Sequence, residues 1–495
     1  MSKQQREFDL ESTRAEQQLS IREGRRLRYF VQTFGCQQNE NDSEKIAGIL
    51  ECLGFLPALS YTEADLILIN SCSIRENADD RLFGHLGMLK QAYEDSGRQL
   101  LIGVCGCMVT RPQLVTKIKE SYPQVRLLMT PQEIHELPKK LIEVYRGEGT
   151  ALETSMDEVI VEGIPQERER RFRALLSIMY GCNHFCSYCV VPFARGRQRS
   201  RRAHDILAEA SELAASGFTE LMLLGQNVNA WGLDHGAADL RFARGRNRSD
   251  LIRAHEESAE PKTFPELLAA LAAIPGIRCI RYMSPHPRDF TPQMIDALAL
   301  FPEIESRLHL PLQSGSDRIL RAMRRGYKLH EYRALVQAAR EARPDLALTT
   351  DIIVAFPGES ESDFEATLSA VEEFAFQSAY TFIFSPRPGT PAAHLPEIPA
   401  PIASARFQKL LALQNRLTAE SYSARVGKTV EVLVEGASRQ NPSIFTARDH
   451  AFYLYNLELC ENALQEGDRL DVLVTEARAF SALARPLERV RVGEC

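Results

Sequence analysis

This sequence lacks long apolar runs: no stretch of eighteen or more apolar residues occurs, and the N-terminus has no apolar secretion signal. A helical membrane span is therefore excluded, and we expect a cytoplasmic protein without membrane contact. Basic residues are not in excess either: the chain has 59 Lys and Arg but 66 Asp and Glu, which gives a net charge of -7. A nucleic-acid binder is usually basic, so such a function would depend on local clusters of Arg and Lys.

Size, composition and cysteine content indicate a folded protein of several domains. With 495 residues the chain is too long for one hydrophobic core, and 44% hydrophobic and 25% charged residues exclude whole-chain disorder. Eleven cysteines are present. In a reducing cytoplasm they are not expected to form a disulfide framework, so they bind metal, take part in catalysis or fill the core.

The N-terminal part predicts an extension followed by a parallel sheet. Residues 1–27 are polar and charged without apolar periodicity, and we predict a mobile extension there. From 28 to 150, strand patterns alternate with helical ones, which predicts an α/β unit with a flavodoxin-like or Rossmann-like parallel sheet. We expect its first helix to be capped by Asp42 or Ser43 and stopped by Gly54. The buried strand patterns are 28–32, 66–69 and 100–104.

The central and C-terminal parts predict two barrels. Strand patterns within 168–400, separated by helical ones, predict a partial (β/α)6 barrel of the TIM type, with its reactive centre at the carboxyl ends of the strands. The charge-rich connection 235–262 is too long for a compact loop, and we predict an exposed insertion. After a linking helix near 403–420, period-two alternation predicts a small all-β barrel over 424–490. The strands of the partial barrel begin near Leu175, Glu220, Arg278, Arg307, Leu346 and Tyr380.

Three cysteines at positions i, i+4 and i+7, namely Cys182, Cys186 and Cys189, give the most specific signal in the chain. Such a loop can ligate three irons of a [4Fe-4S] cluster and leave the fourth iron open, whereas an electron-transfer cluster usually has four Cys ligands. With an aromatic residue, Tyr188, before the last Cys, the spacing resembles the hallmark of the radical S-adenosylmethionine (SAM) superfamily. A zinc site usually pairs its cysteines as C-x2-C, and chance grouping of core cysteines is the other alternative.

Three further cysteines, Cys36, Cys72 and Cys107, each lie just past a predicted strand of the N-terminal unit. Because carboxyl ends of parallel strands meet at one edge of a sheet, these thiols can come together. Taken singly, each is more often a small buried hydrophobe than a ligand, and Cys105 can replace Cys107 on geometric grounds. The cysteines that we interpret as structural are Cys52, Cys279, Cys460 and Cys495.

The motifs around these cysteines resemble the MiaB family of tRNA methylthiotransferases, and the resemblance extends from about residue 28 to 490. It rests on the segments around both cysteine groups and on several loops between them. The matching segments are Gly35-Cys36-Gln37-Gln38-Asn39, Asn70-Ser71-Cys72-Ser73-Ile74-Arg75-Glu76, Gly106-Cys107-Met108, Gly181-Cys182-Asn183-His184-Phe185-Cys186, Gly225-Gln226-Asn227, Ser284-Pro285-His286-Pro287 and Leu312-Gln313-Ser314-Gly315-Ser316.

The resemblance implies a two-cluster radical enzyme. Cys36, Cys72 and Cys107 would hold an auxiliary [4Fe-4S] cluster that carries or supplies sulfur. One SAM would methylate that sulfur, and a second SAM, cleaved at the cluster of Cys182, Cys186 and Cys189, would yield the 5′-deoxyadenosyl radical that removes hydrogen from C2 of adenine. The implied substrate is N6-isopentenyladenosine at position 37 of tRNA, which becomes its 2-methylthio derivative.

Alternative functions remain within and outside this family. Related branches modify threonylcarbamoyladenosine or an aspartate of a ribosomal protein, but segments 37–39 and 73–76 favour the isopentenyladenosine branch. A non-catalytic iron-sulfur protein that binds RNA as a redox sensor is the alternative from another class. Such a sensor needs no vacant iron for SAM, so the three-cysteine loop argues against it.

Candidate contacts to RNA and SAM lie close to the cysteine loop. The basic run 194–202 would place positive charge beside the anticodon loop, or else it pairs with carboxylates or remains solvated. For SAM we expect contacts from loops after the second and fourth barrel strands, although such loop residues often bond only their own backbone. Tyr188 either packs on adenine or fills the core of the loop. The other candidate SAM contacts are Gly225, Gln226, Asn227, Ser314 and Ser316.

The C-terminal module resembles the TRAM RNA-binding domain at 427–436 but departs from the pattern beyond Thr446. From Arg425 to Cys495 there are nine Lys and Arg against eleven Asp and Glu, so a basic RNA platform is not evident. The resemblance implies tRNA, through its anticodon stem-loop, and SAM as partners. It also implies a low-potential electron donor such as flavodoxin or ferredoxin and an unidentified sulfur donor, and we expect a monomer.

Overall fold

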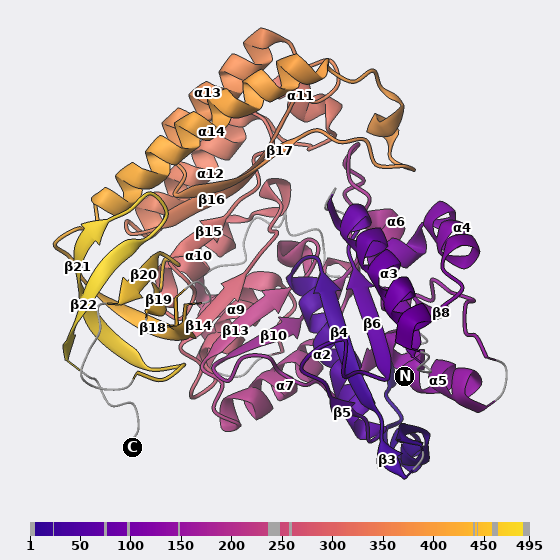
Figure 1. The fold of residues 1–495 in the computed structure, drawn as a ribbon. Helices are drawn as coiled ribbons and strands as arrows, with labels where there is room; N and C mark the ends of the chain where they lie inside the picture. The colour runs from indigo at the N-terminus through magenta and orange to yellow at the C-terminus, as the bar shows by residue number, and fades with distance from the viewer. Residues whose placement is uncertain are drawn as a thin grey trace.

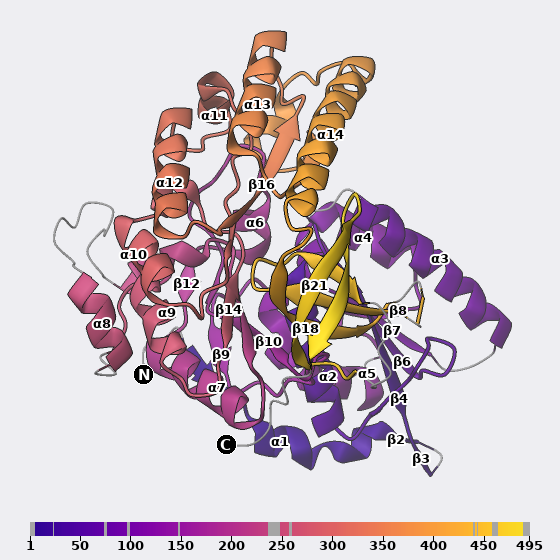
Figure 2. The ribbon, with the colours of Figure 1, turned by 90° about the vertical axis from the view of Figure 1, so that its left-hand side faces the viewer.

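The computed structural model describes residues 5–22, 24–73, 77–96, 100–146, 149–235, 248–256, 260–438, 441–442, 444–457 and 464–488. An N-terminal sheet with its helices and a C-terminal barrel lie on opposite flanks of a larger central unit (Figures 1 and 2). Within these ranges no helix is long and apolar enough to cross a membrane.

The N-terminal unit is a five-stranded parallel sheet with helices on both faces, as predicted. Two of its inner strands, 66–71 and 101–105, are buried along their whole length, which is typical of a sheet covered on both sides. Helices α2 (Gln37–Cys52) and α5 (Leu137–Arg146) cover one face, and α3 (Asn77–Ser96) and α4 (Pro112–Ser121) the other. The strand order is β5 (Leu56–Pro57), β4 (Arg28–Phe34), β6 (Leu66–Ser71), β7 (Leu101–Cys105) and β8 (Val125–Met129).

The N-terminal extension differs from its prediction. Strand β1 (Gln5–Glu7) pairs in parallel with β9 (Ile160–Glu162), and α1 (Leu10–Ala15) and the short strands β2 (Ile21–Arg22) and β3 (Arg25–Arg26) follow. Leu19 and Leu27 are buried in the core beneath α2. The described part of residues 1–27 is therefore folded against the rest of the chain and is not a mobile extension. The prediction was wrong because these two leucines are buried in the core although the segment has no apolar periodicity.

Helix α2 begins earlier than predicted. Its N-cap is Cys36, so Asp42 and Ser43 lie inside the helix and do not cap it. Asp42 is buried and forms an ion pair that holds it there. Gly54 follows the helix with a φ of 85° and ends it, as expected.

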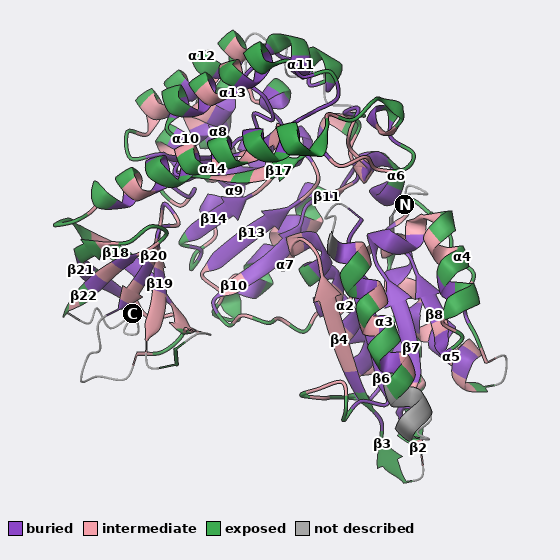
Figure 3. Cartoon of the chain, turned by 45° about the horizontal axis from the view of Figure 1, so that its top comes forward, coloured by how far each residue is buried: buried purple, intermediate pink, exposed green. Residues whose placement is uncertain are grey.

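The central unit is a partial barrel of six parallel strands, which confirms the predicted α/β architecture. It consists of two three-stranded sheets, and a parallel bridge between Ile280 and Ile304 joins them. The first five strands are mostly buried, the last strand is largely exposed, and the outer faces of the helices are exposed (Figure 3). The strands are β10 (Arg173–Ser177), β13 (Glu220–Leu224), β14 (Cys279–Tyr282), β15 (Arg307–His309), β16 (Ala347–Val354) and β17 (Ser378–Ile383). The helices include α7 (Ala203–Ala215), α9 (Phe264–Ala272), α10 (Pro292–Leu300), α11 (Asp317–Ala322), α12 (Leu329–Ala342), α13 (Glu361–Phe374) and α14 (Ala400–Ser423).

Part of the predicted insertion is helical and packed. Helix α8 (Arg248–Glu256) lies against α9, and Leu251 is fully buried in the core of the central unit. This part is therefore not an exposed loop, since the apolar Leu251 anchors it. Positions 236–247 and 257–259 of the insertion lie outside the described residues.

The C-terminal unit is a closed five-stranded barrel, as the alternation predicted in outline. Strands β19 (Phe445–Asp449) and β22 (Ala482–Glu488) were not predicted, because neither shows a clear alternation of apolar and polar residues. Residues 451–453, expected in a strand, form the turn before β20. The strand order is β18 (Thr429–Ala437), β19 (Phe445–Asp449), β20 (Leu454–Leu457), β22 (Ala482–Glu488) and β21 (Arg469–Ala477).

Candidate active site

The cysteine loop follows the first barrel strand directly. Strand β11 (Met179–Tyr180) leads into it, and helix α6 (Val191–Arg195) begins two residues after Cys189. Gly181 enters the loop with a φ of 71°, and a Cβ atom there would lie 2.1 Å from the carbonyl oxygen of Arg197. Glycine is thus required for the loop to fold back on segment 196–198. The loop lies at the carboxyl end of β10, where barrels of this type hold their reactive centres.

The three thiols of this loop influence one another electrostatically. Burial, together with the neighbouring Cys186, raises the pKa of Cys182 to about 11 and that of Cys189 to about 12. Arg325 is buried beside them, and its Nη1 donates to Cys186 Sγ at 3.6 Å. Buried thiols resist ionisation unless a cation offsets the charge, and a metal that takes thiolate ligands provides that offset.

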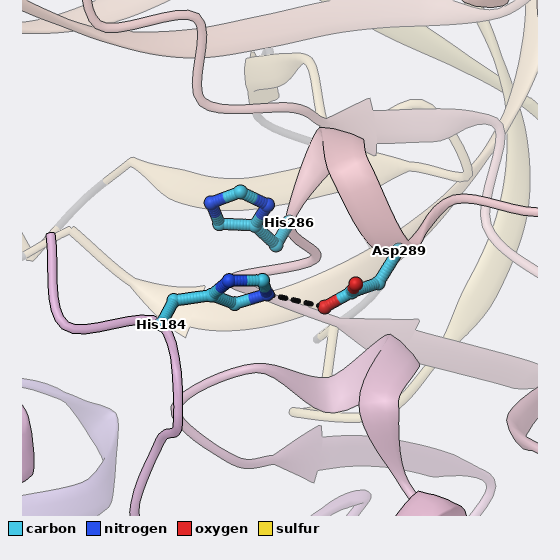
Figure 4. A group of neighbouring side chains, drawn as sticks. All are labelled: His184, His286 and Asp289. Atoms are coloured by element: carbon cyan, nitrogen blue, oxygen red, sulfur yellow. Dashed lines mark hydrogen bonds and ion pairs between the residues drawn. The ribbon is translucent and has the colours of Figure 1, made fainter. Parts of the chain in front are cut away.

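A second group of side chains, His184, His286 and Asp289, ties this loop to the next two loops of the barrel (Figure 4). His184 Nε2 contacts the carboxylate of Asp289, which also accepts from Asn227 Nδ2 at 2.8 Å. The ring of His184 stacks on that of His286. These atoms are close enough to hold a metal ion, but stacked rings direct their nitrogen lone pairs in parallel and do not converge on one ion. The group therefore serves better to fix the loop.

The predicted SAM contacts after β13 lie beside the cysteine loop. Gln226 Oε1 accepts from the backbone N–H of Gly181 at 2.5 Å. Asn227 is buried, and its Oδ1 has no hydrogen-bond partner among the described residues. Gly225 lies against Met179. A Cβ atom added at Gly225 would lie only 2.5 Å from Met179 Cγ. A buried amide oxygen without a partner indicates a place for a polar ligand.

The predicted contacts after β15 are occupied within the protein. The hydroxyl of Ser314 bonds Thr367 Oγ1 and the N–H of Ser316, and Ser316 caps α11. These bonds match the alternative of loop residues that satisfy their own backbone. The neighbouring Gln313, which was not predicted as a contact, is buried, and its Oε1 has no hydrogen-bond partner in the part of the chain that the structure describes. Tyr188 packs against the apolar cluster that contains Met323, Phe356 and Phe384.

The second group of cysteines also comes together. Cys36, Cys72 and Cys107 follow β4, β6 and β7, the three central strands of the N-terminal sheet. A hydrogen bond with Cys72 and the charge of Arg195 lower the pKa of Cys36 to about 6 against the effect of burial. Cys107 is buried as well, and burial raises its pKa to about 11. Cys105 donates instead to the carbonyl of Ile69 and packs in the core on the α2 side.

Helix α6 links the two cysteine groups. It starts just after Cys189 and ends at Arg195, whose Nε donates to Cys107 Sγ at 2.9 Å. The helix has five residues. At a rise of about 1.5 Å per residue it spans less than two turns, so the two groups of thiols are near neighbours across it.

The basic run 194–202 is mainly internal. Arg195, Arg199 and Arg201 are buried. Arg201 pairs with Glu162 at 2.5 Å and with Glu209 at 2.8 Å, so the alternative of pairing with carboxylates describes it. Arg197 and Arg202 are exposed. The sequence gives no sign of this burial because Glu162 lies 39 residues before Arg201 in the chain.

Arg325 and Asp289 were also not predicted from the sequence, and Arg195 was expected only as one charge of the basic run 194–202. Charge alone did not distinguish a buried arginine from a solvated one. Positions 74–76 of the second cysteine motif lie outside the described residues.

Three family models match the chain in the order of its structural units. Residues 28–130 match the uncharacterized protein family UPF0004, residues 176–371 the radical SAM superfamily, and residues 423–487 the TRAM domain. The TRAM match covers the five-stranded barrel, although the sequence departs from the pattern beyond Thr446.

Curated relatives match almost the whole chain. The chain is 41% identical to the tRNA-2-methylthio-N(6)-dimethylallyladenosine synthase of Acetivibrio thermocellus over 97% of this chain and 95% of that protein. It is 39% identical to the protein of the same name from Bacillus subtilis over 97% of this chain and 88% of that protein. The chain therefore belongs to the tRNA-2-methylthio-N(6)-dimethylallyladenosine synthase family, within the radical SAM superfamily of enzymes.

Proposed function

We propose that this chain transfers a methylthio group to C2 of N6-isopentenyladenosine at position 37 of tRNA, in the cytoplasm. The observation that carries the proposal is the gathering of six cysteines, from two separate units, at the two ends of helix α6. Three thiols per group suit a [4Fe-4S] cluster with one iron left for a reacting partner. The proposed ligands are Cys36, Cys72 and Cys107 for one cluster and Cys182, Cys186 and Cys189 for the other.

The donor atoms around both groups fit this assignment. The thiols are largely buried and each group has one arginine donating to a sulfur, which suits clusters with net negative charge. Unpartnered atoms on Asn227 and Gln313, together with Gly225, Gln226 and Tyr188, support a SAM site at the carboxyl ends of the strands. Ser314 would have to exchange its bonds to Thr367 for SAM. When bound, the clusters would supply the electron that cleaves SAM and the sulfur that is transferred.

The residues of the chain would position the base and exclude water. Phe185 and Phe193 are 38% and 47% exposed and meet edge to face with centroids 6.1 Å apart. Arg197 lies over the ring of Phe185 at 5.7 Å. Exposed aromatic rings with an arginine are typical platforms for unstacked RNA bases. Because they adjoin the cysteine loop, we propose that they receive a base of the anticodon loop.

All six cysteines belong to one chain, so we propose that a monomer carries the complete site. The sequence modules 28–150, 168–400 and 424–490 would divide the work between sulfur supply, radical formation and RNA binding. A low-potential electron donor such as flavodoxin or ferredoxin and a separate sulfur donor complete the proposed set of partners.

Nucleoside analysis tests the proposal. The chain is expressed in a bacterial strain that makes N6-isopentenyladenosine in tRNA but lacks its own methylthiotransferase, and tRNA nucleosides are measured by mass spectrometry. We expect the 2-methylthio derivative with the native chain and none with Cys36→Ala. If the native chain leaves isopentenyladenosine unchanged, the proposal is wrong, and methylthiolated threonylcarbamoyladenosine would instead identify the related branch.

A further inference from the structure

Arg195 lies buried between the thiol of Cys107 and the carboxylate of Asp42. Its Nε donates to Cys107 Sγ at 2.9 Å, and its Nη2 forms an ion pair with Asp42 Oδ2 at 2.7 Å. The side chains of Arg195 and Asp42 are 5% and 4% exposed. A charge pair this deeply buried is costly to desolvate and is seldom justified by stability alone.

The orientation of the pair gives the cysteine group a definite electrostatic environment. The cation is next to the sulfur, and the anion lies behind the cation. An N–H donor to a ligand sulfur and a nearby positive charge both stabilise the reduced, more negative form of an iron-sulfur cluster. Water screens this effect very little, because both partners are buried.

The other cysteine group has a weaker counterpart. Arg325 Nη1 lies 3.6 Å from Cys186 Sγ, and the same guanidinium also donates to the carbonyl of Pro311 and to Tyr327. The Arg325 guanidinium is therefore shared among several acceptors, whereas the Arg195 guanidinium is shared between Cys107 Sγ and Asp42. The shorter contact of Arg195 gives the Cys36, Cys72 and Cys107 group the stronger stabilisation of added negative charge.

We propose that Arg195, held by Asp42, is a positioning residue that raises the reduction potential of the auxiliary cluster; this inference rests on the proposed function. A cluster that is easier to reduce can accept the electron left over when sulfur joins the base. The carbon radical would bring one electron and the methylthiolate two, and the new carbon-sulfur bond would hold two, so the third electron would go to the oxidised cluster.

Redox titration of each cluster by itself tests the inference. In full-length protein with Cys182, Cys186 and Cys189 changed to Ala and reconstituted anaerobically, the auxiliary cluster is titrated and followed by electron paramagnetic resonance. We expect Arg195→Gln to lower the reduced-to-oxidised ratio at a fixed potential about tenfold, which corresponds to about 59 mV for one electron. Arg195→Lys should recover most of this change. Asp42→Asn should shift the ratio in the opposite direction, because it removes the compensating anion.

The reciprocal protein is the matched control. With Cys36, Cys72 and Cys107 changed to Ala, Arg195→Gln should leave the potential of the remaining cluster unchanged, whereas Arg325→Gln should lower it. If Arg195 had a purely structural role, Arg195→Gln and Asp42→Asn would not shift the reduction potential of the auxiliary cluster in opposite directions.

Specific results would overturn the inference. It is wrong if Arg195→Gln and Asp42→Asn shift the auxiliary potential in the same direction or leave it unmoved. Should Arg195→Gln fail to retain iron, the direction in which Arg195→Lys and Asp42→Asn shift the reduction potential of the auxiliary cluster decides whether the inference holds. If the protein without Cys182, Cys186 and Cys189 holds no cluster at all, the proposed function itself fails and the inference with it.

Discussion

The imidazole ring of His184 lies 3.8 Å from that of His286, centroid to centroid, with 15° between the two planes. His184 stands inside the cysteine loop, and His286 opens the loop after β14. Together with Asp289 they hold together two segments that are 105 residues apart in the sequence. The conformation of the cysteine loop therefore depends on groups that are not cysteines.

Weakening this link should impair SAM cleavage. Changing Asp289 to Asn removes the acceptor charge for His184 and disturbs the bond from Asn227. Residues that orient metal ligands typically affect activity by about 10–100-fold, and we expect a loss of SAM cleavage in this range. The measurement is the rate of 5′-deoxyadenosine formation under reducing conditions. Unchanged cleavage in Asp289→Asn would show that the link does not hold the loop.

Removing the exposed aromatic pair should weaken RNA binding and spare SAM chemistry. A stacked base contributes about 1–3 kcal/mol, so changing Phe185 and Phe193 together to Ala should raise the Kd for an anticodon stem-loop about tenfold or more. SAM cleavage without RNA should stay within twofold. Leu59→Ala, at a position that is 93% exposed and lies in the N-terminal unit, is the control and should alter neither. An unaltered Kd in the double variant would show that Phe185 and Phe193 do not contribute to RNA binding.

Phe452 should matter for the attachment of the C-terminal barrel. Its ring lies 4.0 Å from the guanidinium of Arg307 and 4.8 Å from that of Arg281, both on strands of the central unit. Each such contact stabilises by about 0.5–2 kcal/mol, so we expect Phe452→Ala to destabilise this interface by about 2 kcal/mol. Hydrogen exchange in β14 and β15 measures the loss. Phe480→Ala, in the exposed turn between β21 and β22, is the control and should leave hydrogen exchange in β14 and β15 unchanged. Equal exchange in the two variants would show that Phe452 does not attach the barrel.

Much of the fold followed from the sequence because its strands are short, apolar and regularly spaced. Patterns such as 66–69 and 100–104 mark parallel strands, and the position of Cys72 and Cys107 just beyond them was enough to predict that they approach each other. The same logic placed the loop of Cys182 at the end of the first barrel strand.

The parts that sequence did not predict depend on partners distant in the chain. Arg201 looks like a solvated cation until Glu162, 39 residues away, is placed beside it, and Asp42 looks like a cap until Arg195 meets it. Leu19 joins the core from a segment with no apolar period, so its neighbours alone do not reveal it. Buried charge pairs and single anchoring residues leave no periodic trace in a sequence.

The most direct test of the account is the iron content of the native protein and of variants lacking one cysteine group, all purified and reconstituted without oxygen. We predict about eight irons per chain for the native protein and about four when either group is changed to Ala, at four irons per cluster. SAM cleavage should persist without Cys36, Cys72 and Cys107 and vanish without Cys182, Cys186 and Cys189. Changing the buried Cys105 to Ala should leave iron content unaltered. About four irons in the native protein, or zinc in their place, would contradict the account.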